Sequence, residues 1–473
     1  MMLKSRAIAA GPALLLAAGL VVTAAPVANA APLAGPVPAA AQPTASAKAA
    51  ANADPFFDYD GSRPLAEFAP GELLKTRTIA YHVAGIPLPV TVEQLLYRST
   101  NLRGEAVANA TSVIKPAPPT PLEFLSPLKG RGKLVSYQSA YNSLNPEDGP
   151  SRAIAGDFSL GNLVTGSGSA GAVVPTAEGA ILVPLLKQGY TVAMPDTEGP
   201  AAEFGTGAAY GRYTLDALRA AYNSPKAGLN KDTKTALIGY SGGAIGTNWT
   251  AALAPTYAPD VNKNLVGATS GGLLVAPVNN LDYVSGTPLW AGIAPMAVKG
   301  VSRALGIDLT PYLNDRGVKL FNQLENASVL VGVPLGSGVT WADLAKPEYS
   351  DPLSVPAFVE AVNKVNLGLI GSPTTPIQTA MGGNGVLEGT PGFGTGDGVM
   401  LVGDIRSLAR QYCAAGTPVD YTEHPLLSHA GAAIAWYPGA LSWINDRFAG
   451  KAAPNNCAGI APGNPLVPAQ VTR

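Results

Sequence analysis

The sequence predicts an α/β fold in which a mostly parallel sheet is flanked by helices and carries an inserted helical cap. Short apolar strands alternate with helical segments over most of the chain, which is the pattern of parallel sheets. One strand runs directly into Gly239-Tyr240-Ser241-Gly242-Gly243, and a helix of small residues follows. Between Ser270 and Ile377 about a hundred residues break this rhythm, far more than a normal strand-to-helix connection.

The expected elements follow one another from residue 89 to residue 448. Strands are predicted at 89–98, 110–114, 133–138, 190–194, 235–239, 265–270, 377–381 and 419–423. Helices are predicted at 178–187, at 213–222, after Gly242, at 402–412 and at 438–448. In the last of these, Pro438 would occupy the first turn, where its missing N–H costs nothing. Further helices at 296–305, 318–324 and 355–365 form the predicted cap.

The first thirty residues have the pattern of a Sec signal peptide. Lys4 and Arg6 precede an apolar run at 7–22, and Ala28-Asn29-Ala30 supplies a cleavage site. The alternative is an uncleaved membrane anchor, which the short apolar run and the cleavage site disfavour. No other uninterrupted run of about 18 apolar residues follows.

Five segments are therefore expected along the chain. Residues 31–53, mostly Ala, Pro, Gly, Ser and Thr, are interpreted as a linker or pro-segment. The core is predicted in two parts, 54–272 and 375–473, with the cap at 273–374.

Composition excludes several classes of protein. The chain has 473 residues, of which 47% are hydrophobic and 13% are charged, with a net charge of -1. A disordered chain would be apolar-poor and highly charged, and a nucleic-acid binder usually has a basic excess. Cys413 and Cys457 are the only cysteines. In an exported protein we expect them to form a disulfide, which would contribute about 3–4 kcal/mol. Two cysteines and three histidines are too few to supply the ligands of a metal site easily, so no metal is expected. No cofactor is expected either.

The G-x-S-x-G sequence predicts a nucleophile elbow, a sharp strand-to-helix turn that presents a serine. Gly239 and Gly243 leave no side chains to collide with the neighbouring strand and helix. Tyr240 completes the turn, and Ser241 is the expected nucleophile. The N–H of Gly242, at the helix N-terminus, would face an oxyanion.

A serine nucleophile needs a base and an orienting acid. Of the three histidines in the chain, only His424 and His429 follow Ser241 in the sequence. His429 lies in a loop before the last predicted helix and is favoured over His424, although the sequence leaves both open. Asp397, in a glycine-rich loop, is the favoured acid. Asp404 is expected on a helix, facing solvent or capping its first turn.

The second oxyanion donor is expected in a loop after an earlier strand. A backbone N–H near Asp196, in the turn that follows strand 190–194, is the candidate. The alternative is a polar turn with no role in catalysis.

A second glycine motif, Gly166-x-Gly168-x-x-Gly171, matches the dinucleotide fingerprint. Neither a strand–turn–helix unit nor a ribose-binding acid frames it. A Gly/Ser loop is the favoured interpretation.

Together these residues resemble the secretory lipase family, which includes fungal lipase A-type enzymes and secreted actinobacterial lipases. The resemblance spans about residues 54–448. Its markers, in order, are Asp54-Pro55-Phe56, Gln94 to Arg98, Ser136-Tyr137-Gln138, Asp196 to Gly199, Gly239 to Gly243, and Asp397 about thirty residues before His429. It implies an α/β-hydrolase core with a helical cap, Ser241, Asp397 and His429 as triad, and Asp196 and Gly242 as oxyanion hole.

The sequence departs from the family at three places. Thr197 replaces a histidine that often follows the aspartate, residues 382–396 look like an insertion before Asp397, and an additional cysteine pair is absent.

The expected function is a secreted serine ester hydrolase, most simply a triacylglycerol lipase or carboxylesterase. Its partner would be a lipid or another ester, with interfacial contact at lipid droplets or membranes. No nucleic acid and no obligate protein partner is expected. The alternatives are a peptidase, deacetylase or polyester hydrolase with the same triad, and a secreted lipid-binding protein without turnover.

Overall fold

The computed structural model describes residues 54–120, 128–157 and 172–472. The predicted signal peptide, the linker and the Gly166–Gly171 motif lie outside these residues. Nine strands form one sheet in the order β1-β2-β3-β5-β4-β6-β7-β8-β9. Their bounds are β1 Leu73–Val83, β2 Ile86–Thr100, β3 Ala106–Ile114, β4 Leu134–Gln138, β5 Thr191–Pro195, β6 Thr235–Tyr240, β7 Leu265–Gly271, β8 Ile377–Gly382 and β9 Val419–His424.

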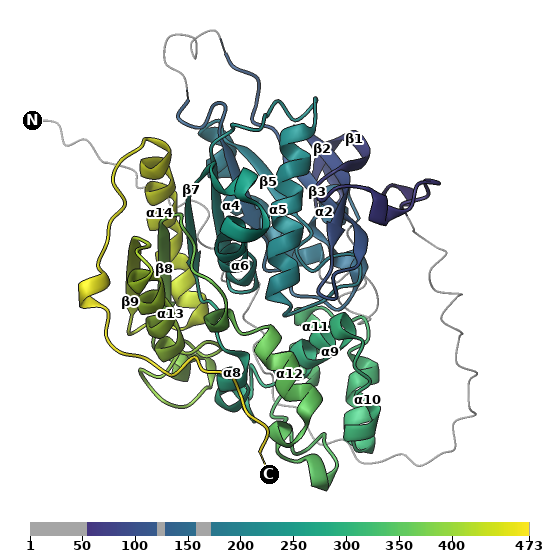
Figure 1. The fold of residues 1–473 in the computed structure, drawn as a ribbon, viewed down its shortest axis with the longest axis vertical. Coiled ribbons are helices and arrows are strands. Elements are labelled where there is room, and N and C mark those ends of the chain that lie inside the picture. The colour runs from purple at the N-terminus through teal and green to yellow at the C-terminus, as the bar shows by residue number, and fades with distance from the viewer. Residues whose placement is uncertain (1–53, 121–127, 158–171, 473) are drawn as a thin grey trace, which may run out of the picture.

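The sheet is mixed but mostly parallel. The pairs β1–β2, β2–β3 and β3–β5 are antiparallel, whereas the pairs from β5 through β4 and on to β9 are parallel. The predicted α/β fold class is confirmed (Figure 1). None of the predicted strand ranges corresponds to β1, which carries His82. The Nδ1 of His82 lies 3.0 Å from the carbonyl oxygen of Ile154, a structural contact.

Helices cover both faces of the sheet. The bounds are α2 Pro150–Ile154, α4 Val173–Lys187, α5 Gly207–Asn223, α6 Gly242–Tyr257, α7 Pro259–Asn262, α13 Val402–Ala414 and α14 His429–Phe448. Successive residues of β6 point to opposite cores: Leu237 packs with α5, α6 and α13. Ala236 and Ile238 pack with α4 and α14 on the other face. The alternation of buried side chains on one strand therefore builds a three-layer core.

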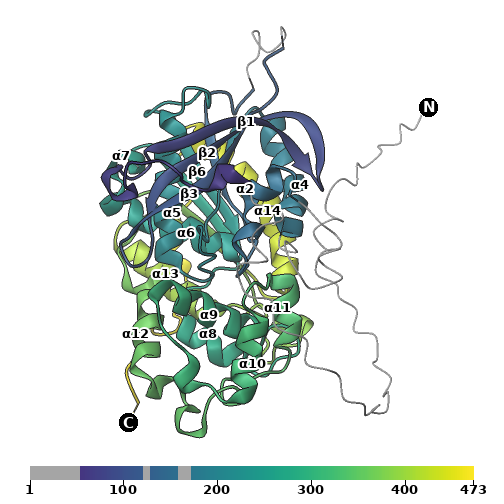
Figure 2. The same cartoon turned by 90° about the vertical axis from the view of Figure 1, so that its right-hand side faces the viewer.

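The interval between β7 and β8 is helical and has its own small core. It holds α8 Pro277–Val284, α9 Ile293–Leu305, α10 Asp315–Gln323, α11 Val329–Leu335 and α12 Pro356–Lys364. Met296, Phe321, Leu324 and Val333 are buried together there. We call residues 273–374 the helical insertion. Figures 1 and 2 show it as a layer beyond one end of the sheet strands.

The last helix begins earlier than predicted. Helix α14 starts at His429, and Ser428 caps it by accepting from the N–H of Gly431. Pro438 lies inside the helix rather than in its first turn. The cap at Ser428 and the apolar face of the helix, which includes Trp436, Ala440 and Ile444, outweigh the hydrogen bond that Pro438 removes.

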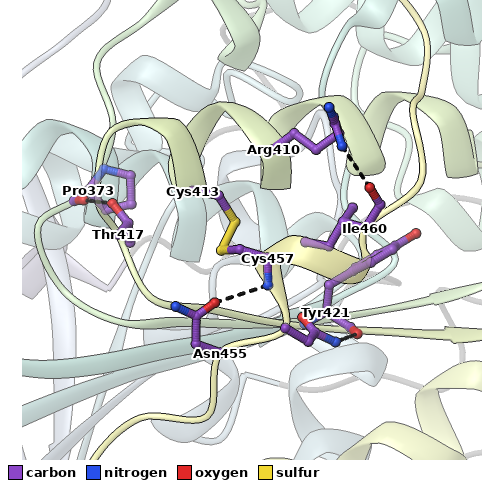
Figure 3. Close-up of a disulfide and its surroundings, with 9 residues drawn as sticks. Pro373, Arg410, Cys413, Thr417, Tyr421, Asn455, Cys457 and Ile460 are labelled. Atoms are coloured by element: carbon purple, nitrogen blue, oxygen red, sulfur yellow. Dashed lines mark hydrogen bonds between the residues drawn. A yellow bond between two sulfur atoms is a disulfide. The ribbon is translucent and has the colours of Figure 1, made fainter.

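The predicted disulfide is confirmed. Cys413, near the end of α13, is bonded to Cys457, which begins the 3₁₀ turn η12 (Cys457–Gly459), and the two Cα atoms are 5.8 Å apart. Close by, Arg410 Nη1 donates to the carbonyl of Ile460 at 2.8 Å (Figure 3). The bond therefore joins α13 to the segment that follows α14.

In the described part of the chain, no helix is both long and apolar enough to cross a membrane. Nor do His, Cys, Asp and Glu gather in a metal-binding group anywhere within 54–120, 128–157 and 172–472.

Candidate active site

Ser241 stands between β6 and α6 in a strained backbone conformation. Its φ is +54° and its ψ is -120°, a region that non-glycine residues rarely adopt. A Cβ at Gly239 would lie 2.4 Å from the carbonyl oxygen of Gly243, and one at Gly243 would lie 2.1 Å from that of Gln138. Both contacts are impossible for a side chain. Glycine is therefore required at both positions if the turn is to present Ser241.

Three side chains form a hydrogen-bonded chain across the carboxyl ends of β6, β8 and β9. His429 Nε2 lies 2.9 Å from Ser241 Oγ, and His429 Nδ1 lies 2.6 Å from Asp397 Oδ2. The peptide N–H of His429 also donates to the carbonyl of Asp397 at 2.8 Å. The structure thus brings Ser241, His429 and Asp397 together. His424 lies at the end of β9, and its carbonyl accepts from Gly383 and Leu427.

Asp397 is fully buried and well supported. Its Oδ1 accepts from the N–H groups of Val399 and Met400 at 3.0 and 2.8 Å, so Oδ2 is directed to the imidazole. Asp404 was expected to face solvent or to help cap the first turn of its helix, but it is buried and makes no cap hydrogen bond, so both expectations are wrong. Its Oδ1 accepts from the side-chain amides of Asn279 and Asn464, so it ties α13 to two other segments rather than capping it.

Burial and charge act in opposite directions on His429. Burial alone lowers the pKa of the imidazole, but the charge of Asp397, the hydrogen bond to it and the charge of Glu388 outweigh burial and raise the pKa. Tyr240 lies beside the ring, with centroids 5.2 Å apart, and its hydroxyl donates to the carbonyl of His429 at 2.6 Å. His429 is therefore held through its backbone and through both ring nitrogens.

Asp196 does not fit its predicted role as an oxyanion donor. Its N–H already donates to the carbonyl of Ala110 at 3.0 Å, and its carboxyl accepts from the N–H of Ser151. Burial raises the pKa of this carboxyl to about 7. The topological reason is that Asp196 follows β5, whereas β4 is the strand that lies directly beside β6.

The loop after β4 reaches the elbow instead. Asn142 lines one pocket with Ser241 and Gly242, and a Cβ at Gly242 would lie 1.8 Å from Asn142 Oδ1. The φ of Asn142 is +42°, and its N–H has no acceptor among the described residues. Asn142 was missed in the sequence analysis, although the marker Ser136-Tyr137-Gln138 directly precedes this loop.

Two buried carboxylates hold this loop, which we call the oxyanion loop (residues 139–144). Glu178 Oε1 accepts from the N–H of Ala140 at 2.9 Å, and Glu178 Oε2 accepts from Ser139 Oγ. Glu198 Oε2 accepts from the N–H of Ser143 at 2.9 Å. Burial raises the pKa of Glu178 to about 7 and that of Glu198 well above its usual range.

The helical insertion holds the same loop from the other side. The N–H of Val329 donates to the carbonyl of Asn142 at 2.8 Å, and the N–H of Leu144 donates to that of Ala327 at 2.9 Å. Arg303 Nη1, from α9, donates to the carbonyl of Leu144 at 2.8 Å. The insertion is thus hydrogen-bonded to the main chain of the loop that lies beside Ser241 and Gly242.

Apolar side chains dominate the pocket that Ser241 lines. With its mouth included, it encloses about 650 Å³ of empty space. Besides Ser241, Gly242 and Asn142 it is lined by Phe204, Gly205, Ile245, Leu274, Pro277, Asn280, Leu281, Val284, Trp290, Ile293, Ala294, Ala297, Val399 and Met400. A second apolar pocket between α8, α9 and α12 shares three of these residues, Pro277, Leu281 and Ala297. Apolar surface thus extends from Ser241 into the insertion.

Comparison with known proteins identifies a family and several relatives that this chain resembles. Residues 167–456, more than half of the chain, match the family described as secretory lipase. A protein named "Probable inactive lipase MT1628" from Mycobacterium tuberculosis is 31% identical over 81% of this chain and 79% of its own. Lipase 4 of Candida albicans is 29% identical over 85% of this chain and 83% of its own.

Solved structures show the same fold. The X-ray structure of Candida antarctica lipase A in its closed state has a TM-score of 0.71 at 25% identity, covering 87% of this chain and 89% of that one. A rice cell wall degrading esterase from Xanthomonas oryzae has a TM-score of 0.55 at 17% identity, covering 80% of this chain and 97% of that one, which shows the fold alone. The resemblance inferred from the sequence markers is confirmed, and the chain belongs to the secretory lipase family.

Proposed function

We propose that this protein is a secreted carboxylic ester hydrolase of the triacylglycerol lipase type that works through an acyl-enzyme on Ser241. The observation that carries the proposal is the hydrogen-bonded chain from Ser241 through His429 to Asp397. The apolar pocket that begins at Ser241 supports an acyl chain as the part of the substrate that is bound. The disulfide and the family fit an exported protein, with residues 1–30 as its signal peptide.

In the first half of the reaction, Ser241 Oγ attacks the ester carbonyl carbon while His429 Nε2 takes the hydroxyl proton. The carbonyl π electrons move to oxygen, and the N–H of Gly242 with that of Asn142 would stabilise the oxyanion. When the tetrahedral intermediate collapses, the alkoxide leaves and receives the proton from His429. Asp397 keeps the imidazole in the tautomer that can accept this proton.

In the second half, water replaces the alcohol. His429 takes one proton from the water as its oxygen attacks the acyl carbon, and the same donors hold the new oxyanion. Collapse returns the electron pair and the proton to Ser241 Oγ and releases the carboxylic acid. The enzyme ends as it began, so no cofactor takes part in the balance.

A non-catalytic lipid-binding protein is the second candidate, because one relative carries the word "inactive" in its name. The strained Ser241 and the short contacts of His429 favour turnover, since a binding protein has no need of either.

The test is hydrolysis of p-nitrophenyl esters of increasing chain length by the purified mature protein. We expect Ser241→Ala to abolish hydrolysis and covalent labelling by a fluorophosphonate, and His424→Ala to retain both. An intact Ser241 that neither turns over ester nor accepts the label would support the binding protein. Cleavage of peptide substrates in preference to esters would point to another reaction on the same triad.

A further inference from the structure

Glu388 lies next to the catalytic histidine, in a part of the chain that the mechanism above does not use. It ends the 3₁₀ turn η11 (Gly385–Glu388), in the segment between β8 and Asp397 that the sequence marked as an insertion. Its two carboxylate oxygens have separate partners. Oε1 accepts from the N–H of Ala430 at 2.9 Å, and Oε2 accepts from the indole Nε1–H of Trp290 at 2.8 Å.

Both partners of Glu388 are neighbours of His429, one along the chain and one in space. Ala430 is the next residue along the chain, so its peptide fixes the first turn of α14. The indole of Trp290 packs edge-on against the imidazole, with centroids 5.7 Å apart and planes at 75°. One carboxylate thus holds the backbone that follows the base and an aromatic ring that lies against it.

The segment that carries Glu388 packs tightly against the turn that carries Asp397. Gly398, the residue after Asp397, has a φ of +124°, and a Cβ there would lie 3.1 Å from Glu388 Oε2 and 3.4 Å from Trp290 Nε1. Thr390 Oγ1 donates to the carbonyl of Gly398 at 2.7 Å. The segment is therefore packed onto the turn that carries the orienting acid.

We propose that Glu388 is a second, positioning carboxylate of this active site, which fixes the imidazole of His429 opposite Ser241 and strengthens it as a base. The inference rests on the proposed function, in which His429 is the base. Asp397 contacts Nδ1 directly, whereas Glu388 acts through Ala430, through Trp290 and through its charge. It touches no reacting atom.

The charged groups that face His429 are two carboxylates. Asp397 comes from the loop after β8 and Glu388 from η11, and both raise the pKa of His429 against the lowering by burial. Tyr240 on β6 and Tyr283 on α8 also face this region, but burial raises the pKa of each phenol, that of Tyr283 to about 12. In the part of the chain that the structure describes, no Lys or Arg side chain pairs with Glu388.

The proposal has a consequence for the pH profile. A base with a raised pKa is protonated, and therefore inactive, up to a higher pH, so the acid limb of kcat/KM lies higher. Replacing the carboxylate by a neutral amide lowers the pKa of His429 and moves the acid limb to lower pH. A residue that only supported the fold would reduce the rate at every pH and leave the limb where it was.

The experiment compares full pH profiles of a soluble p-nitrophenyl ester for the wild type and Glu388→Gln. We expect the acid limb of Glu388→Gln to move to lower pH and its plateau kcat to fall about fivefold, because a glutamine can accept from only one of the two N–H donors. Trp290→Phe keeps the charge and should lower the plateau without moving the limb. Glu348→Gln, at an exposed position of the helical insertion, is the matched control and should change neither.

Histidine-ring NMR gives a second readout, since the chain has three histidines. The His429 titration should move to lower pH in Glu388→Gln, while His82 and His424 act as internal references. An unmoved limb and an unmoved His429 titration would overturn the proposal. If Glu388→Gln failed to fold, an unchanged plateau in Trp290→Phe would do so. A wild type without ester hydrolysis or fluorophosphonate labelling would refute the proposed function instead.

Discussion

The two sides of Ser241 are built from different kinds of group. On the base side of the proposed mechanism the groups are side chains: His429 begins α14, and Asp397 and Glu388 lie in the segment between β8 and α13. On the oxyanion side, the proposed donors are main-chain N–H groups, those of Gly242 and of Asn142 in the oxyanion loop (residues 139–144), and both residues line the pocket with Ser241. Buried carboxylates and the helical insertion hold that main chain.

The carboxyl groups on the two sides of Ser241 also differ in what they do. Asp397 and Glu388 act on a titrating imidazole, and their charge raises its pKa. Glu178 and Glu198 accept hydrogen bonds from peptide groups, and burial raises their own pKa values. A raised pKa favours the protonated form, so these two carboxyls carry less negative charge beside the proposed oxyanion than ordinary glutamates would.

The largest effect should come from Asp397→Asn. The two N–H groups of Val399 and Met400 would hold the amide oxygen, so the NH₂ group would face His429 Nδ1. The imidazole would then carry its proton on Nε2 and could not accept one from Ser241. We expect kcat to fall by roughly 10³- to 10⁴-fold, measured with a nitrophenyl ester.

Asp404→Asn is the control for this change. Asp404 is also buried and nearby in sequence, but it binds Asn279 and Asn464 and not the histidine. Its kcat should stay within a few-fold of the wild type. Equal losses in the two variants would mean that the base side depends on packing rather than on the orientation of its histidine.

The contrast between the two sides also explains what the sequence could predict. On the base side, Ser241, Asp397 and His429 are chemically distinctive residues in a fixed chain order, and the structure brings them together. Nothing distinctive marks a backbone N–H. Asp196 was therefore chosen by its place after a strand, and the choice missed that β4 lies between β5 and β6. The order of strands in a sheet is set by long-range pairing, which local patterns do not contain.

The fold shows the same limit. The strands from β2 to β9 were placed to within a few residues, because short apolar runs identify them. The start of α14 was missed by nine residues, since Pro438 was given more weight than the cap at Ser428. Glu388 left no signal at all, because its partners, Trp290 and Ala430, are distant in sequence.

An intermediate effect is expected where the helical insertion meets the oxyanion loop. Arg303→Met keeps the apolar stem of the side chain but removes the donors to the carbonyls of Leu144, Ala201 and Glu325. The free energy of unfolding should fall by about 2–3 kcal/mol. We expect kcat to fall about tenfold with a smaller change in KM, because the loop serves the transition state.

Lys299→Met is the control that separates the loss of the Arg303 hydrogen bonds from the loss of a positive charge on α9. Lys299 is also on α9 and pairs with the carboxylate of Glu325 at 2.5 Å, as Arg303 does, but this pairing involves no carbonyl of the oxyanion loop. Its kcat should be unchanged. If Arg303→Met and Lys299→Met had the same kcat, the insertion would have no influence on the oxyanion side.

The smallest effect should be a change in how stability depends on pH. The pKa of Glu178 is about 7 in the folded protein and about 4.5 when unfolded. At a pH between these two values, the Glu178 carboxyl is mostly protonated in the folded protein and mostly ionised in the unfolded chain. The stability that this carboxyl contributes is fully present below about pH 4.5 and is lost as the pH rises to about 7.

Glu178→Gln cannot ionise, and its amide can still accept from the N–H of Ala140. Its Tm should therefore decrease less than that of the wild type between pH 5 and pH 7.5, by about 2–4 °C in calorimetric scans. Glu105→Gln is the control, because it removes an exposed carboxylate whose pKa is lowered by the hydrogen bond to Arg103. The contribution of Glu105 to stability therefore changes only at lower pH. Between pH 5 and pH 7.5 the change in Tm of this variant should match that of the wild type. Parallel curves for wild type and Glu178→Gln would mean that Glu178 is ionised in the folded protein. Both sides of Ser241 would then carry fixed charge, and the contrast between them would fail.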